Sequence, residues 1–376
     1  MSIFFRPKEK FSVYEVGGDD SQTSHFYIDE DRKISRAYNF PFLNFDLRKR
    51  FEVKKENRQK YSIVALSPDF SAVRFFNFKY IRPNKDIPVD EVEIENFLAQ
   101  LTQKTFLEFR EEVGQEMGRD ELDTILLGSR PVAFFVDSSL VHSPVGLRGR
   151  EVRGVLELIF TDRASFDAVQ PIIYSGDKVF LTTKDKSELM AVAHSAGKSA
   201  LLDIRPDGRS IFLEYEPGGK EILRRQFLSW SLGDFLGRIA EIWGLGPFST
   251  LDIYDRYLNG AVSVRVEEQI LKLWKPALNS LLGELSRIKA NGSVYFKSPI
   301  EFPKDIPLKK GRVELKNYPH EAVLPKLGFE LDKKFKPNSV KDNFAQLAPL
   351  IECYYDKGDE RINHPLRRRI HWLISH

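Results

Sequence analysis

The chain has one cysteine, almost no net charge and no long hydrophobic run, and each scarcity excludes a class of protein. The single cysteine, Cys353, rules out an intramolecular disulfide and leaves too few thiols for a cysteine-based zinc site. A net charge of +3, from 57 basic and 54 acidic residues, argues against a strongly basic nucleic-acid-binding protein. Because no run of about 18 apolar residues occurs and the N-terminus lacks a signal peptide, we expect a cytoplasmic protein without a membrane-spanning helix.

What the sequence does have is enough apolar material for several folded lobes. Its 376 residues are 42% hydrophobic and 30% charged, which favours a folded chain of about two to four lobes. Strand-like and amphipathic helical segments are interspersed, so we expect an α/β or α+β architecture. One helix should start near Val89, reach Met117 and end at Gly118, and two more should lie over 228–243 and 266–288.

Two segments have the pattern of a strand, a tight turn and a second strand. In the first, apolar residues over 11–28 flank Gly17 and Gly18, and in the second, apolar residues over 201–213 flank a Pro-Asp-Gly turn. The paired glycines either supply the positive φ of a hairpin turn or let a phosphate approach the backbone closely. Asp203, at the end of a strand, is either a turn-capping residue or a carboxylate beside a magnesium ion.

Three further segments follow in a recognisable order. Residues 144–149 read Pro-Val-Gly-Leu-Arg-Gly, which is similar to the Pro-x-Gly-Met-x-Gly segment in the subdomain that FtsA inserts between its two hairpins. Residues 187–193 resemble the helix that enters the second half of that fold, and residues 363–376 resemble its membrane-targeting tail. The chain as a whole therefore resembles FtsA, the actin homologue of the bacterial divisome. The resemblance covers most of the chain and is weakest over 30–90 and 297–355.

This resemblance implies an α/β, actin-like (ribonuclease-H-like) fold of two lobes with an FtsA-type inserted subdomain. The implied parts are a first lobe, the inserted subdomain, a second lobe, a helical subdomain and an amphipathic C-terminal tail. In that order they span residues 1–88 with 166–198, 89–165, 199–225 with 290–355, 226–289 and 356–376.

The resemblance also implies a nucleotide site at the two hairpins, with ATP and magnesium as its cofactors. In FtsA-like proteins each half of the fold contributes one hairpin to the phosphates. The residues that match these positions are Gly17, Gly18, Asp203, Gly208 and Ser210.

The surroundings of these positions depart from the family's pattern. Glu15 stands where the family has aspartate, and Asp19 and Asp20 add negative charge that would repel a phosphate. In the second turn Arg205 and Pro206 replace glycines, and proline has no N–H to donate. We therefore expect a degenerate site that does not hydrolyse ATP, with no catalytic residues and no metal centre of its own.

The C-terminal segment has the pattern of a helix that lies in a membrane interface. Apolar residues fall on one helical face, arginines crowd the remainder, and Trp372 lies near the boundary. The alternative is a terminal helix that docks on the protein core. The residues expected to contact the membrane are Leu366, Arg367, Arg368, Arg369, Ile370, Trp372, Leu373 and Ile374.

The resemblance implies a scaffold of cell division on the cytoplasmic face of the inner membrane. Its partners would be a tubulin-like division protein, other division proteins and further copies of the chain in filaments, but not nucleic acid. Arg148 and Arg150 are the residues expected to meet a partner, although their turn also reads as a strand connection that needs glycine. Two other functions stay open: a PilM-like adaptor of the type IV pilus machinery, and an ATP-dependent kinase of the same superfold.

Overall fold

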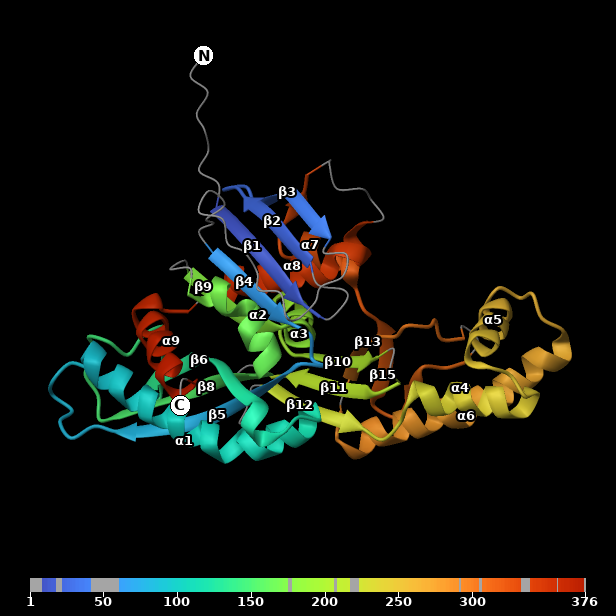
Figure 1. Ribbon diagram of the computed structural model, residues 1–376, viewed down its shortest axis with the longest axis horizontal. Coiled ribbons are helices and arrows are strands. Elements are labelled where there is room, and N and C mark those ends of the chain that lie inside the picture. Colours follow the sequence, from blue (N-terminus) through green and yellow to red (C-terminus); the bar gives the residue numbers. More distant parts are fainter. Residues whose placement is uncertain are drawn as a thin grey trace, which may run out of the picture. The chain divides into compact units, whose positions relative to one another are not determined.

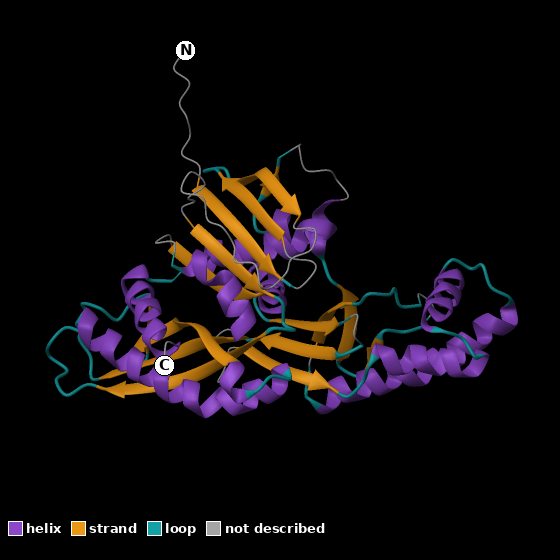
Figure 2. Ribbon diagram, in the orientation of Figure 1, coloured by secondary structure: helices purple, strands orange, loops and turns teal. Residues whose placement is uncertain are grey.

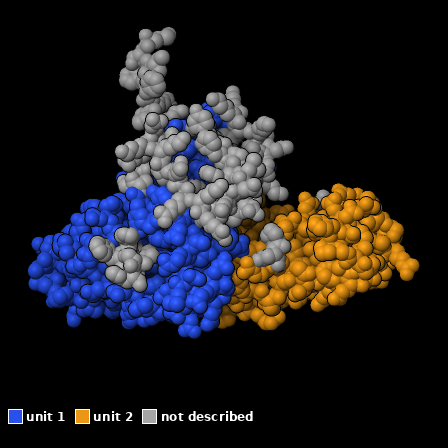
Figure 3. Space-filling model, in the orientation of Figure 1, with its two compact units in different colours: residues 1–191, 321–376 blue, residues 192–320 orange. Residues whose placement is uncertain are grey.

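The chain folds into two compact units. The computed structural model describes residues 9–17, 22–41, 61–174, 178–205, 208–216, 223–290, 292–303, 306–332, 339–356 and 358–374. One unit comprises Met1–Ala191 with Glu321–His376, and the other comprises Val192–His320 (Figure 3). Both units mix helices with strands (Figure 2). Within the described ranges, no helix combines the length and the apolar character needed to cross a membrane.

A six-stranded sheet forms the centre of the first unit. Its strands are β1 (Glu9–Val16), β2 (Gln22–Ile28), β3 (Lys33–Pro41), β4 (Tyr61–Leu66), β9 (Lys178–Thr183) and β16 (Glu330–Leu331). Their order is β16-β3-β2-β1-β4-β9. Figure 1 labels five of them, β3, β2, β1, β4 and β9, in that order. β1, β2 and β3 run antiparallel, whereas β4 and β9 run parallel to β1. Every residue of β1 from Phe11 to Val16 is buried, as expected of a strand with both faces covered.

A second sheet is inserted into the first unit between β4 and β9. Its strands are β5 (Ser71–Ile81), β6 (Thr124–Val136), β7 (Ser139–Val141) and β8 (Glu151–Asp162), which are antiparallel in the order β5-β8-β6-β7. Because β5 pairs with β8 along its whole length, this inserted subdomain begins at Ser71 and not at residue 89 as the sequence suggested.

One face of the inserted sheet is covered by α1 (Glu91–Met117) and α9 (Glu360–Ile374). Ile94 of α1, Phe160 of β8 and Leu366 of α9 belong to one buried cluster there. The start of α1 carries a capping box, and its end is Gly118 in the left-handed conformation, with φ 65°. The prediction of a helix that ends at Gly118 is confirmed. A short 3₁₀ turn, η3 (Glu121–Asp123), follows.

Two of the remaining helices of the first unit come from late in the chain. They are α2 (Arg163–Ile173), α3 (Lys184–Ala196), α7 (His320–Lys326) and α8 (Ser339–Asp356). α8 packs against β1, β4 and β9, and buries Phe344 and Leu347. The sequence-based assignment of residues 290–355 to the second lobe is therefore wrong from Glu321 onward, because these residues belong to the first unit.

The second unit repeats a six-stranded sheet and adds three helices. The strands are β10 (Ser199–Ile204), β11 (Ser210–Tyr215), β12 (Leu223–Leu228), β13 (Gly292–Lys297), β14 (Lys309–Lys310) and β15 (Val313–Asn317), and the helices are α4 (Leu232–Trp243), α5 (Pro247–Leu258) and α6 (Val264–Arg287). Trp274 is fully buried in its core and donates a hydrogen bond from Nε1 to the Tyr254 hydroxyl at 3.1 Å.

Five strands of each six-stranded sheet share one topology, and the sixth strands, β16 and β14, lie at opposite edges. The second has the order β12-β11-β10-β13-β15-β14, in which β10, β11 and β12 are antiparallel and β13 and β15 run parallel to β10. Its first five strands match the order β3-β2-β1-β4-β9 and its orientations strand for strand. A duplicated sheet of this kind is what the actin-like resemblance implied, so the prediction of an α/β, two-lobed fold of that type is confirmed.

Candidate functional site

The first hairpin, between β1 and β2, brings a buried carboxylate and a lysine together. Glu15 is 2% exposed, and its Oε1 lies 3.1 Å from Nζ of Lys184, the first residue of α3. A Cβ added at Gly17 would lie 3.1 Å from the same ammonium group. The lysine therefore approaches the backbone where the resemblance implied a phosphate. Gly18 lies outside the described residues.

The second hairpin, between β10 and β11, also pairs its carboxylate with a cation from the chain. Oδ2 of Asp203 lies 3.5 Å from Nε of the buried Arg205. Gly208 has φ 87°, and a Cβ there would lie 2.9 Å from the backbone nitrogen of Gly233. The backbone N–H of Leu232 donates to the Gly208 carbonyl at 3.0 Å. Close approach to the start of α4 therefore accounts for this glycine without a nucleotide.

The residues expected to bind nucleotide are divided between the two units. Gly17 lies in the first unit, whereas Asp203, Gly208 and Ser210 lie in the second. Ser210 is buried at the start of β11, opposite Ile204 of β10. In each hairpin, a lysine or arginine of the chain pairs with the carboxylate near the end of the first strand. Among the described residues, no three His, Cys, Asp or Glu side chains gather as metal ligands would.

A buried cluster of four charged side chains in the first unit had no counterpart in the sequence analysis. Nε of Arg130 lies 2.6 Å from Oε2 of Glu157, and Nη2 of Arg130 lies 3.3 Å from Oε1 of Glu352. Lys186 contacts both carboxylates, at 2.6 Å in the case of Glu352. The Thr182 hydroxyl donates to Glu352 at 2.6 Å. Two cations and two anions thus join β6, β8, α3 and α8 in a network with no net charge.

Burial and pairing act in opposite directions on this four-charge cluster. Burial alone would raise the pKa of Glu157, but Arg130 and Lys186 outweigh it and hold that pKa below its ordinary value. Burial alone would lower the pKa of Arg130, but Glu157 and Glu352 raise it. Glu157 and Arg130 therefore stay charged near neutral pH, which suits a structural tie better than a proton donor or acceptor.

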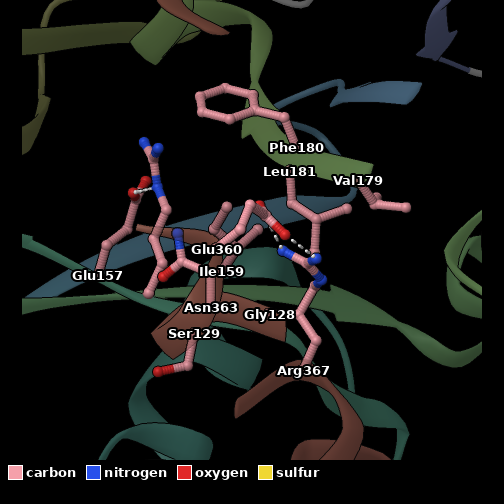
Figure 4. A pocket seen from close by; sticks show the side chains of 11 residues that line it. Gly128, Ser129, Glu157, Ile159, Val179, Phe180, Leu181, Glu360, Asn363 and Arg367 are labelled. Atoms are coloured by element: carbon pink, nitrogen blue, oxygen red, sulfur yellow. Dashed lines mark hydrogen bonds and ion pairs between the residues drawn. The ribbon is translucent and has the colours of Figure 1, made fainter. Parts of the chain in front are cut away.

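A small pocket is lined by Arg130 and Glu157 of the four-charge cluster and by residues of α9 (Figure 4). Its volume is about 20 Å³, enough for about one water molecule and too small for a nucleotide. Glu360, Asn363 and Arg367 of α9 line it, and Arg367 forms an ion pair with Glu360 at 2.8 Å. The strand residues that line it are Gly128, Ser129, Arg130, Glu157, Ile159, Val179, Phe180 and Leu181.

Two loops of the inserted subdomain, residues 82–90 and 142–150, are joined by the buried side chain of Arg82. Its Nε and Nη2 each donate to the carboxylate of Glu93 at 2.9 Å, and its Nη1 donates to the carbonyl of Gly149 at 3.1 Å. These hydrogen bonds from Arg82 hold the pKa of Glu93 below its ordinary value. We call residues 82–90 and 142–150 the tip loops.

Arg148 and Arg150, the residues expected to meet a partner, both lie in the second tip loop. Both are exposed, and neither forms an ion pair within the part of the chain that the structure describes. The backbone N–H of Arg150 donates to Oδ1 of Asp137 at 3.1 Å, which fixes the backbone and leaves the guanidinium group accessible.

The C-terminal helix α9 docks on the inserted subdomain. Ile362 and Leu366 are buried at 1% and 0% exposure in the cluster that α1 and β6 also form. Nε of Arg369 lies 2.7 Å from Oε1 of Glu95 on α1, and its Nη1 donates to Asn96 at 2.7 Å. The sequence left two alternatives for this segment, a membrane-interface helix and a terminal helix docked on the core. The described part of α9 matches the docked helix.

Docking corrects the expectation for one of the proposed membrane-binding residues. Leu366 is inside the core and does not face a bilayer in this conformation. Arg367 and Arg369 form ion pairs within the chain, whereas Arg368 is exposed. The side chains of Ile370, Trp372, Leu373 and Ile374 lie outside the described residues, so membrane contact by these residues stays a prediction.

Comparisons with known proteins found similar structures but no similar sequence. No protein-family model matches the chain. No curated protein matches it by sequence either.

Several solved structures are similar along most of the chain. One is the PilM-PilN type IV pilus biogenesis complex, with 14% identity, coverage of 97% of this chain and 99% of the other, and a TM-score of 0.48. A Bacteroides thetaiotaomicron protein of unknown function with an actin-like ATPase fold has 9% identity, covers 87% and 98%, and has a TM-score of 0.35. The cytoplasmic domain of EpsL, from the type II secretion system of Vibrio cholerae, has 10% identity, covers 85% and 94%, and has a TM-score of 0.31. At these values the fold assignment depends on the duplicated sheet topology.

Proposed function

We propose that this chain is an actin-fold adaptor that binds a partner protein through its inserted subdomain and does not turn over ATP. The observation that carries the proposal is that the carboxylate near the end of the first strand of each hairpin pairs with a cation of the chain, Glu15 with Lys184 and Asp203 with Arg205. A magnesium ion needs the free oxygen lone pairs of such carboxylates, and a neighbouring cation competes for them and repels the metal. The replaced glycines of the second turn add to this, because Pro206 offers no N–H to a phosphate.

The conformation of α9 bears on what kind of adaptor this is. A division scaffold that links a tubulin-like filament to the inner membrane needs a tail whose apolar face is free to enter the bilayer. Here Leu366 of that face is part of the protein core. This favours an adaptor that is recruited by a partner protein, and the link to cell division or to pilus assembly stays a prediction.

Steady-state phosphate release tests the absence of ATP turnover. The full chain is incubated with ATP and magnesium, and we expect no release above the rate without protein. The same sample is heated with and without ATP and magnesium, because a nucleotide that binds the native state raises the unfolding midpoint. Sustained phosphate release that disappears in an Asp203→Asn variant would refute the proposal.

A further inference from the structure

The tip loops present apolar side chains to solvent. Ile81, Ile87, Val92 and Leu147, on or directly beside these loops, are 50%, 57%, 55% and 39% exposed. Single exposed apolar residues are ordinary, but a group of them on adjoining loops is typical of an interaction site. We call these four side chains, together with Arg148 and Arg150, the tip surface.

Hydrogen bonds hold the tip loops in one arrangement. The N–H of Val89 donates to the Leu147 carbonyl at 2.8 Å, and the N–H of Gly146 donates to the Val89 carbonyl at 2.9 Å. The N–H of Arg82 donates to the Arg150 carbonyl at 2.9 Å. Val89 itself is buried in the core of the subdomain. A surface fixed in this way loses little conformational entropy when it binds a partner, so more of its contact energy appears as affinity.

The second tip loop carries two positive charges, Arg148 and Arg150, for which no ion pair is found among the described residues. The first tip loop carries Lys85 together with Asp86 and Asp90. Arg148 and Arg150 are the only charged residues of 143–150. Asp137 is occupied by the backbone N–H groups of Arg150 and Glu151, at 3.1 and 2.9 Å. Glu151 forms ion pairs with basic side chains of β5 and β8. The two guanidinium groups are therefore available to carboxylates from another molecule.

The tip surface includes an open hollow beside Arg150. Its volume is about 550 Å³, and it is open to solvent. Its lining combines the apolar side chain of Ile81 with the polar groups of Lys79, Asp137, Ser138, Arg150 and Glu151. A partner side chain that enters it meets two cations, Lys79 and Arg150, and two carboxylates, Asp137 and Glu151.

We propose that the tip surface binds an acidic segment of a partner protein, in which apolar side chains alternate with carboxylates. The apolar side chains pack on Ile81, Ile87 and Leu147, and the carboxylates contact Arg148 and Arg150. Arginine suits this role because its planar fork binds a carboxylate through two hydrogen bonds. The inference rests on the proposed adaptor function, and it names the surface and the chemistry of the partner.

The test uses two short fluorescein-labelled synthetic peptides and the full chain. In one peptide Asp and Glu alternate with Leu and Phe, and in the other Lys and Arg replace the acids. We expect fluorescence anisotropy to show binding of the acidic peptide only. Affinity should fall by about tenfold or more in the Arg148→Glu, Arg150→Glu double variant, and it should also fall as salt is raised. Leu147→Ser should weaken binding without changing the salt dependence.

The double variant offers a second readout that misfolding cannot imitate. With its charges reversed, it should bind the basic peptide better than the wild type does. Arg163→Glu, at the exposed first residue of α2, is the matched control and should bind the acidic peptide as the wild type does. Equal binding of the acidic peptide by wild type and double variant, or no binding by the wild type, would overturn the inference.

The outcomes also separate this inference from the proposed function. If the chain releases phosphate but still binds only the acidic peptide, the proposal of an adaptor that does not turn over ATP is refuted. The inference about the tip surface is then still supported. No phosphate release and no peptide binding would refute the tip surface alone.

Discussion

At the scale of single residues, the four-charge cluster is where a change of one functional group should matter most. Glu157→Gln keeps the shape of the side chain but leaves Arg130 and Lys186 facing one carboxylate in a site sheltered from water. Breaking a buried pair in this way costs about 3–5 kcal/mol, and we expect that loss in the free energy of unfolding measured in urea. Glu151→Gln removes two partly exposed ion pairs, with Lys79 and Arg153, and should cost about 1 kcal/mol or less. Equally small losses of unfolding free energy in both variants would show that the four-charge cluster does not hold these elements together.

The same residue sets a pH dependence. The ordinary pKa of a glutamate carboxyl, about 4.5, applies to Glu157 in the unfolded chain, and the native pKa is lower because Arg130 and Lys186 outweigh the effect of burial. A lowered native pKa stabilises the fold fully above the unfolded pKa, and this stability is lost as the pH falls towards the native value. Urea unfolding repeated at decreasing pH should therefore show a falling free energy of unfolding below about pH 4.5. The fall should be shallower in Glu157→Gln, and an unchanged slope would contradict the assignment.

At the scale of elements, the buried side chain of Leu366 shows that α9 is docked on the inserted subdomain. Leu366→Ala should lower the free energy of unfolding by about 2–5 kcal/mol, because a fully buried leucine leaves a cavity when it is truncated. The control is Arg368→Ala on the exposed side of the same helix, for which we expect a change within about 0.5 kcal/mol. If urea unfolding does not distinguish the two variants, the helix is not docked in solution.

The elements also show what the sequence could and could not predict. α1 and both hairpins were predictable because helical periodicity, the glycine at the end of α1 and the turn residues are local signals. The docking of α9 was not, because an apolar stripe flanked by arginines fits a protein core as well as a bilayer. The four-charge cluster left only one signal, a glutamate inside the apolar run of β8. The cluster as a whole could not be read from the sequence, because its members come from distant segments: Arg130 and Glu352 are 222 residues apart.

At the scale of the whole molecule, the two units differ in how the chain builds them. The second unit is one continuous segment, Val192–His320, with its own core around Trp274. The first unit needs both Met1–Ala191 and Glu321–His376, because α8 packs on its central sheet and carries Glu352 of the four-charge cluster. A chain that ends at His320 should therefore lose the first unit and keep the second.

Tryptophan makes this prediction easy to follow. A chain that ends at His320 retains Trp230, Trp243 and Trp274, and all three lie in the second unit. Its tryptophan fluorescence should still report a cooperative urea transition, at the midpoint shown by the isolated segment 192–320. Amide hydrogens of β1 and β4 should exchange rapidly in the truncated chain and slowly in the full one, because opening of the first unit no longer requires the removal of α8. Persistent protection of β1 in the truncated chain would mean that the first lobe folds without its C-terminal helices, and that α8 is an accessory rather than a part of its core.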